Sequence, residues 1–144
     1  MGSCEDCGAS YAAPDVDCSM RFDELLALDH SRREPWGSRH GLAFCAFALQ
    51  HPRTYDRDVL QRAWLMLDAV YVRGRDRSAV ARALRASGAS TPAWDAPPLP
   101  SGPPRRPFAT TIADLATFEP DSYAAMLDEW CRATLVGWSI GAAS

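Results

Sequence analysis

The chain has no lysine, no long apolar run and no export signal. All fifteen basic residues are arginine, which together with abundant alanine and proline is typical of a GC-rich genome and favours a bacterial source. No stretch of about 18 apolar residues occurs, which excludes a membrane-spanning helix. The acidic start MGSCEDCGAS lacks the basic and apolar regions of a secretory signal. We therefore expect a cytoplasmic protein with no membrane partner.

Positive charge is also scarce. The formal net charge of −3 argues against binding to nucleic acid, because neutralising phosphates requires a basic face. One local basic patch surrounds Gly74, and we interpret it as a solvated surface, with nucleic acid or an acidic partner as the alternatives. Its arginines are Arg73, Arg75, Arg77, Arg82 and Arg85.

Alternating strand patterns of useful length are missing, whereas apolar residues recur at helical spacing along most of the chain. This predicts an all-α fold, a small helical bundle, and the 144 residues suffice for a single domain, 1–144. The expected parts are a knuckle (1–17), helices (18–88), a proline-rich surface segment (91–107) and C-terminal helices (108–144). The individual helices are expected at 18–31, 38–50, 56–72, 78–86, 111–117 and 121–139, the first two capped by Ser19 and Ser38.

The chemistry-bearing residues are five cysteines: Cys4, Cys7, Cys18, Cys45 and Cys131. Without an export signal, cysteines are more often metal ligands or buried apolar residues than disulfide partners. Cys45 and Cys131 lie in apolar helical patterns and are expected in the core. Cys4 and Cys7 form a CxxC pair followed by glycine, which can aim two thiolates at one tetrahedral ion. A redox pair is the alternative, although the β-α unit that usually carries one is absent from the pattern.

Helical geometry predicts the remaining ligands. Cys18 and Asp29 are eleven residues apart on one face of the first helix, and His40 and His51 have the same spacing on the second. A short turn makes the two helices antiparallel neighbours, so Cys18 should lie near His51 and Asp29 near His40. The two histidines stand about 16.5 Å apart along a helix and cannot share an ion.

We therefore predict a zinc site made by Cys4, Cys7, Cys18 and His51, so that an N-terminal zinc knuckle packs on a helical hairpin. Four protein ligands favour a structural zinc over a catalytic one. A helix-terminal histidine bonded to backbone carbonyls is the alternative for His51.

The pair at the opposite end of the hairpin allows three readings. Asp29 and His40 are candidate catalytic residues, because a carboxylate can orient an imidazole base. They could also complete a second metal site with His30 and Glu24. The third reading is a buried hydrogen bond that joins two helices.

The run Cys4-x-x-Cys7-Gly8, Cys18 before a helix, His40 and Gln50-His51-Pro52 resembles an uncharacterised family of small bacterial proteins, a domain of unknown function. The C-terminal part, with Asp114, Tyr123, Trp130 and Trp138, is similar to the tryptophan-rich last helix of that family. The resemblance covers most of the chain and supports the site, but it implies no activity.

Three functions fit these observations. The first is a zinc-stabilised helical module that binds an unknown protein or small molecule. The second is a small metalloenzyme whose zinc keeps one coordination position open. The third is a thiol-redox protein that uses Cys4 and Cys7.

Overall fold

The computed structural model describes residues 2–87, 98–115 and 118–143 of the chain, which are 62% helical with a two-stranded sheet of minimal size. The prediction of an all-α fold is confirmed. Its elements are β1 (Gly2–Ser3), β2 (Ser10–Tyr11), α1 (Cys18–His30), the 3₁₀ turn η1 (Gly37–Arg39), α2 (His40–Gln50), α3 (Arg57–Leu67), the π-helical turn η2 (Asp68–Val72), α4 (Arg77–Ser87), the 3₁₀ turn η3 (Ile112–Leu115) and α5 (Pro120–Ala143).

Helix starts differ from the prediction in their caps. Asp17, not Ser19, caps α1, because its carboxylate precedes the helix and accepts the N–H of Met20 at 2.9 Å. Ser38 lies inside η1 and donates its hydroxyl to Glu34 at 2.7 Å, so it does not cap α2. At α1 a neighbouring polar residue takes the capping role, whereas at α2 the preceding 3₁₀ turn includes Ser38 and leaves Arg39 at the N-cap without a side-chain bond.

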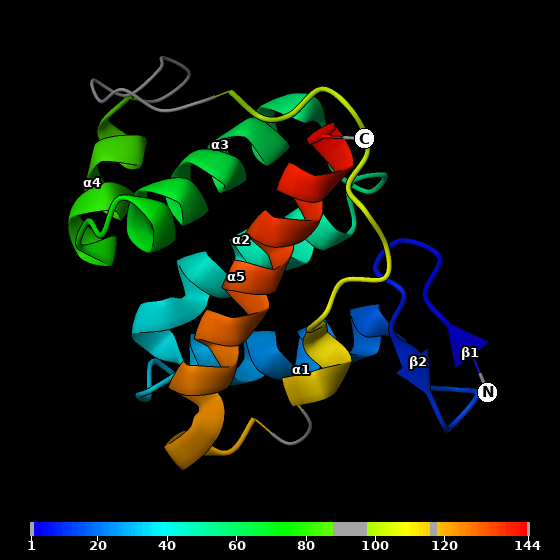
Figure 1. Cartoon of the computed structure of the whole chain (residues 1–144). Helices are drawn as coiled ribbons and strands as arrows, with labels where there is room; N and C mark the ends of the chain where they lie inside the picture. Colours follow the sequence, from blue (N-terminus) through cyan, green and yellow to red (C-terminus); the bar gives the residue numbers. More distant parts are fainter. Residues whose placement is uncertain (1, 88–97, 116–117, 144) are drawn as a thin grey trace.

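The core forms where α5 crosses the other long helices (Figure 1). Trp130 and Leu127 on its inner face are fully buried, as the apolar periodicity of this helix requires. Trp138 is buried too, and its indole N–H donates to the carbonyl of Leu49 at the end of α2, at 2.8 Å. These contacts fix the C-terminal end of α2, which carries His51.

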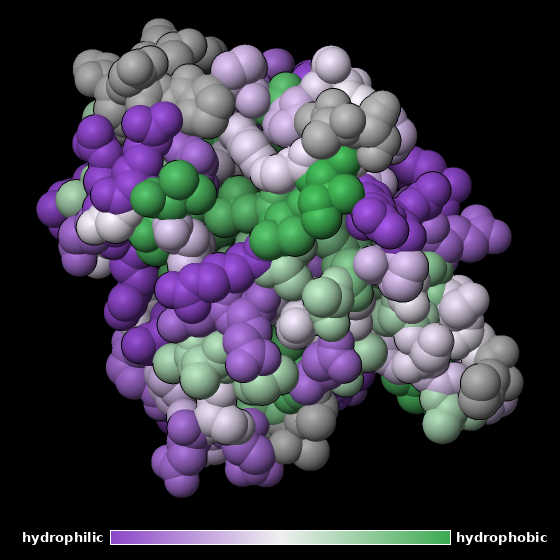
Figure 2. Space-filling model, viewed as in Figure 1, coloured by the Kyte–Doolittle hydropathy of each residue, from purple (hydrophilic) through white to green (hydrophobic). Residues whose placement is uncertain are grey.

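Hydrophobic side chains are mostly covered. On the face drawn in Figure 2, green surface gathers in one band that includes the upper part of α5, and most of the rest is hydrophilic or near neutral. Val136 and Ile140 are the exposed large apolar residues of α5. None of the described helices combines the length and the apolar character needed to cross a bilayer.

The proline-rich segment was expected to run irregularly over the surface, and residues 91–97 lie outside the described part. Residues 98–108 have no helix or strand, as expected, yet they also pack inward. Leu99 is buried and its N–H donates to Gln61 of α3, while the N–H of Arg105 donates to Gly137 of α5 at 2.9 Å. The segment passes the end of α5 and reaches the N-terminal turn (Figure 1).

Candidate metal centre

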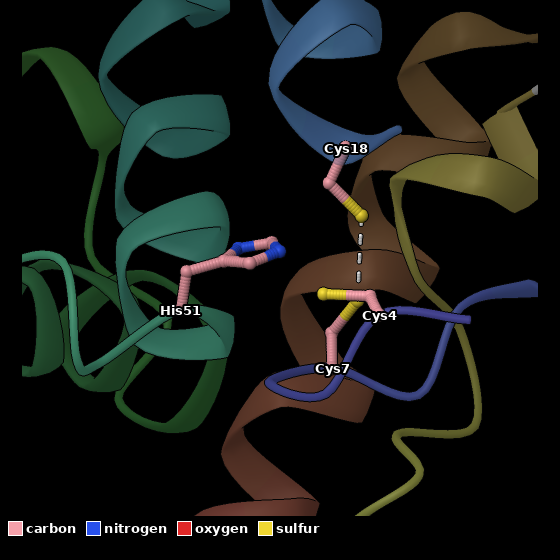
Figure 3. A group of neighbouring side chains, drawn as sticks. All are labelled: Cys4, Cys7, Cys18 and His51. Carbon is pink, nitrogen blue, oxygen red and sulfur yellow. Dashed lines mark hydrogen bonds between the residues drawn. The ribbon is translucent and has the colours of Figure 1, made fainter. Parts of the chain in front are cut away.

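Three cysteines and one histidine meet at the N-terminal end of α1. Cys4 and Cys7 lie on the turn between β1 and β2, Cys18 is the first residue of α1, and His51 directly follows α2. Their ligand atoms all lie within 4.8 Å of one another. Figure 3 shows the imidazole of His51 pointing toward the three sulfur atoms. The structure thus brings together the four residues that the sequence predicts as zinc ligands, and this group could hold a metal ion.

The turn that carries Cys4 and Cys7 is a tight, hydrogen-bonded loop. The N–H of Cys4 donates to Ala9 at 2.8 Å, and the N–H of Gly8 donates back to Cys4 at 2.9 Å. Gly8 has a φ of +84°, a left-handed conformation that residues with a side chain adopt at a cost. A Cβ atom at Gly8 would also lie 2.3 Å from the Cβ of Pro107. Glycine is therefore required here for two independent reasons.

Three contacts hold this turn against the rest of the protein. Arg53, two residues after His51, binds the carboxylate of Asp6 at 2.5 Å. The N–H of Phe108 donates to the carbonyl of Cys7 at 3.1 Å, and Arg106 donates to the carbonyl of Glu5. The sequence pattern gave no signal for these partners, because each joins residues that are remote in the chain.

His51 is oriented by its neighbours on α2. Its Nδ1 lies 2.8 Å from the carbonyl oxygen of Phe47, and because a carbonyl only accepts, Nδ1 carries the proton. Nε2 then holds the lone pair, and it is buried with no hydrogen-bond partner among the described residues. The ring of Phe47 stacks on the imidazole and, on its other side, on the ring of Phe22, both at 4.1 Å between centroids.

The orientation of Nε2 is the arrangement that a metal-binding histidine needs. Buried nitrogen atoms rarely remain unsatisfied in folded proteins, and ligating histidines commonly donate their other ring N–H to a carbonyl or carboxylate. The alternative reading, a histidine bonded to a backbone carbonyl, describes Nδ1 but leaves Nε2 without a partner. The donor set therefore fits a metal ion.

The pKa values of Cys7 and Cys18 are shifted in opposite directions by their contacts within the cluster. The Sγ atoms of Cys7 and Cys18 lie 3.6 Å apart, and the hydroxyl of Tyr11 donates to the Sγ of Cys18 at 3.1 Å. The hydrogen bonds from Cys7 and Tyr11 lower the pKa of Cys18, whereas the bond to Cys18 and burial raise the pKa of Cys7. Tyr11 is a contributor to the site that the sequence analysis missed.

A cleft of about 590 Å³ opens beside the cluster. Cys4, Cys18 and His51 are among its lining residues, together with Leu26, Tyr55 and Asp23. Cys4 is partly exposed, whereas Cys7 is fully buried. The cleft therefore offers a route by which an ion or a small molecule could reach the sulfur atoms.

The second predicted pair also forms. His40 Nδ1 lies 2.7 Å from Oδ2 of Asp29, whose side chain is only 1% exposed, while that of His40 is 43% exposed. The hydrogen bond to Asp29 raises the pKa of His40. Among the described residues no second group of three metal-ligating side chains comes together, and Glu24 pairs with Arg21 instead. The second metal site that we considered for these residues has no support, and the pair joins α1 to α2.

The fold and the cluster together define a small helical protein with a Cys₃His group able to hold a metal ion. More narrowly, the chain belongs to a family of unknown function, DUF5946, whose family model matches residues 2–139. The resemblance to an uncharacterised family is confirmed. No curated protein and no solved structure matches the chain.

Proposed function

We propose that the protein is a zinc-stabilised helical module, with a structural Zn²⁺ held by Cys4, Cys7, Cys18 and His51, and that it binds a protein or small-molecule partner. The observation that carries the proposal is the buried Nε2 of His51, which faces three sulfur atoms and has no other partner in the described part of the chain.

Zinc is favoured by the ligand chemistry. Thiolates mixed with one imidazole form the Cys₃His set of structural zinc sites, and four protein ligands leave no position for a substrate. The ligands come from the N-terminal turn, the start of α1 and the end of α2. One ion would therefore connect three separate segments, and its binding free energy would add to the stability of the fold.

The test is metal analysis of the purified protein combined with X-ray absorption spectroscopy. We expect one equivalent of zinc with three sulfur ligands and one nitrogen ligand. His51→Ala should lose most of the metal, whereas Cys45→Ala, which removes a partly exposed cysteine outside the cluster, should retain it. Equal metal content in the two variants would refute the assignment of His51 as a ligand.

A metalloenzyme with an open zinc position is the second candidate, and the cleft beside Cys4 and Cys18 favours it. In that case one protein ligand is replaced by water, and the absorption spectrum shows three protein ligands and one oxygen. The redox alternative for Cys4 and Cys7 predicts a reversible two-electron titration and no bound metal.

The proposal also includes one domain, residues 1–144, in a reducing bacterial cytoplasm. The single-domain assignment is supported by one connected hydrophobic cluster to which residues from the N-terminal turn through α5 contribute. The cytoplasmic location is supported by the five cysteines, none of which forms a disulfide in the structure.

A further inference from the structure

A second hollow lies away from the cysteine cluster, between the first half of α2 and the helices α3 and α4. It has a volume of about 460 Å³ and an apolar floor. Phe44 comes from α2, Ala63 and Met66 from α3, and Leu84 from α4. A hollow of this size and composition is suited to a small apolar group.

A basic hollow of about 500 Å³ adjoins the apolar one. Its walls carry Arg77, Arg82 and Arg85 of α4, with His40 of α2 across from them. The two hollows share His40, Gly41, Met66, Ala81 and Arg85, so they form one continuous groove. Among the described residues, no aspartate or glutamate lines either hollow. The groove is therefore basic at one end, although the net charge of the chain is −3.

The charged groups at this end are available to a ligand. Arg82 and Arg85 make no ion pair or hydrogen bond within the described part of the chain, and both are exposed. Arg77 is held only by a long bond of 3.4 Å to Ser38, and its Nε is buried without a partner among the described residues. His40 is fixed through Nδ1 by Asp29, so its other ring nitrogen is left for a further contact.

We propose that this groove binds a small amphipathic phosphate monoester, with its apolar ring or chain against Phe44 and Met66 and its phosphate among the arginines. Guanidinium groups bind phosphate oxygens through paired hydrogen bonds. Three arginines and a histidine that line one hollow favour a dianionic phosphate over a singly charged carboxylate. The inference uses none of the proposed zinc ligands and stands independently of the metal.

The first experiment uses calorimetric titration of the full-length protein with three probes that share one ring system. 1-Naphthyl phosphate is a dianion, 1-naphthoate a monoanion and 1-naphthol is neutral at slightly alkaline pH. We expect the phosphate to bind at least about tenfold more tightly than the naphthoate, and the naphthol to bind most weakly, since each charge-assisted contact contributes about a factor of ten. Equal affinity for the phosphate and the naphthoate, or no binding of the phosphate, overturns the proposal.

The second experiment locates the site with matched variants. A Cβ atom at Gly41 would meet only the Cε of Met66, at 3.8 Å, so Gly41→Ala should fold and weaken binding far less than a larger side chain at this position. Gly41→Leu should fill the groove and abolish binding of the phosphate. An unchanged circular dichroism spectrum and metal content would show that Gly41→Leu is folded, and retained binding by this folded variant refutes the location.

The charge is tested by a pair of arginine substitutions. Arg85→Gln should weaken the phosphate about tenfold and leave the naphthol unaffected. Arg105→Gln removes the same charge from an exposed position that does not line the groove, and it should leave both probes unaffected. Equal losses in the two variants would mean that only the overall charge matters, which contradicts a phosphate site in the groove.

Discussion

Replacing Gly8 by alanine tests whether the turn that carries Cys4 and Cys7 depends on its contact with the proline-rich segment. Gly8 and Gly74 both have left-handed backbones, with φ of +84° and +69°. A Cβ atom at Gly8 would lie 2.3 Å from Cβ and 2.8 Å from Cα of Pro107, whereas one at Gly74 would meet nothing within 4 Å. Alanine at either position would therefore have an unfavourable left-handed backbone conformation, but only alanine at Gly8 would also clash with a neighbouring residue.

The left-handed conformation costs a residue with a side chain about 1–2 kcal/mol, and this is the whole loss expected for Gly74→Ala. Forcing a methyl group into a packed contact adds about 1–3 kcal/mol, so Gly8→Ala should lose about 2–5 kcal/mol in total. The backbone of Pro107 cannot rotate away as a flexible side chain would, so the turn must shift and should bind metal more weakly.

Urea-induced unfolding of both variants and the wild type gives the two free energies of unfolding, and competition with a coloured chelator gives their metal affinities. Gly74→Ala should keep the affinity of the wild type. If the two variants lose the same stability and bind metal equally well, the contact between Gly8 and Pro107 does not hold the turn in place.

Three further predictions concern individual polar contacts. Tyr11→Phe removes the hydroxyl that donates to Cys18 and should weaken metal binding about 10–100-fold, measured by chelator competition; an unchanged affinity would contradict a role for this bond. The pKa of His40 is raised above its usual 6.5, chiefly by Asp29, so the pair stabilises the fold fully below pH 6.5 and loses this contribution as the pH rises through the raised pKa. Urea unfolding between pH 6 and 8.5 should show that decline in the wild type but not in Asp29→Asn, and parallel curves would refute the coupling. Gln50→Leu leaves the part-buried carbonyl of Thr110 and the buried hydroxyl of Thr134 without their shared donor and should cost about 1–3 kcal/mol, whereas a thermal melt equal to that of the wild type would show that these bonds do not stabilise the fold.

The sequence predicted the hairpin of α1 and α2 well because its information is local. Residues eleven apart return to the same face of a helix, so the spacing of Cys18 and Asp29 against His40 and His51 determined which ends meet. The rings of Phe22 on α1 and Phe47 on α2 stack with their centroids 4.1 Å apart, which agrees with this alignment of the two helices.

The parts that the sequence did not predict depend on contacts between remote segments. The pairing of β1 with β2 involves two residues on each side, too few to produce an alternating pattern. The ion pair of Arg53 with Asp6 joins two residues that are ordinary surface charges when read alone. Residues 98–108 pack inward through backbone hydrogen bonds. The pattern of side chains in the sequence does not predict such bonds. Side-chain periodicity predicts which face of a single helix or strand is buried, but it does not predict which backbone groups form hydrogen bonds between remote segments.

The column of rings formed by Phe22, Phe47 and His51 bears on how fast an ion could be exchanged. The imidazole stacks on the ring of Phe47, and its Nδ1 lies 2.8 Å from the main-chain carbonyl of Phe47 in α2. It points toward the sulfur atoms (Figure 3). A rotation of the imidazole away from the sulfur atoms would therefore break both the stacking on Phe47 and the bond from Nδ1. Both contacts lie within the end of α2, so they would slow the release of an ion from His51 without any movement of α1.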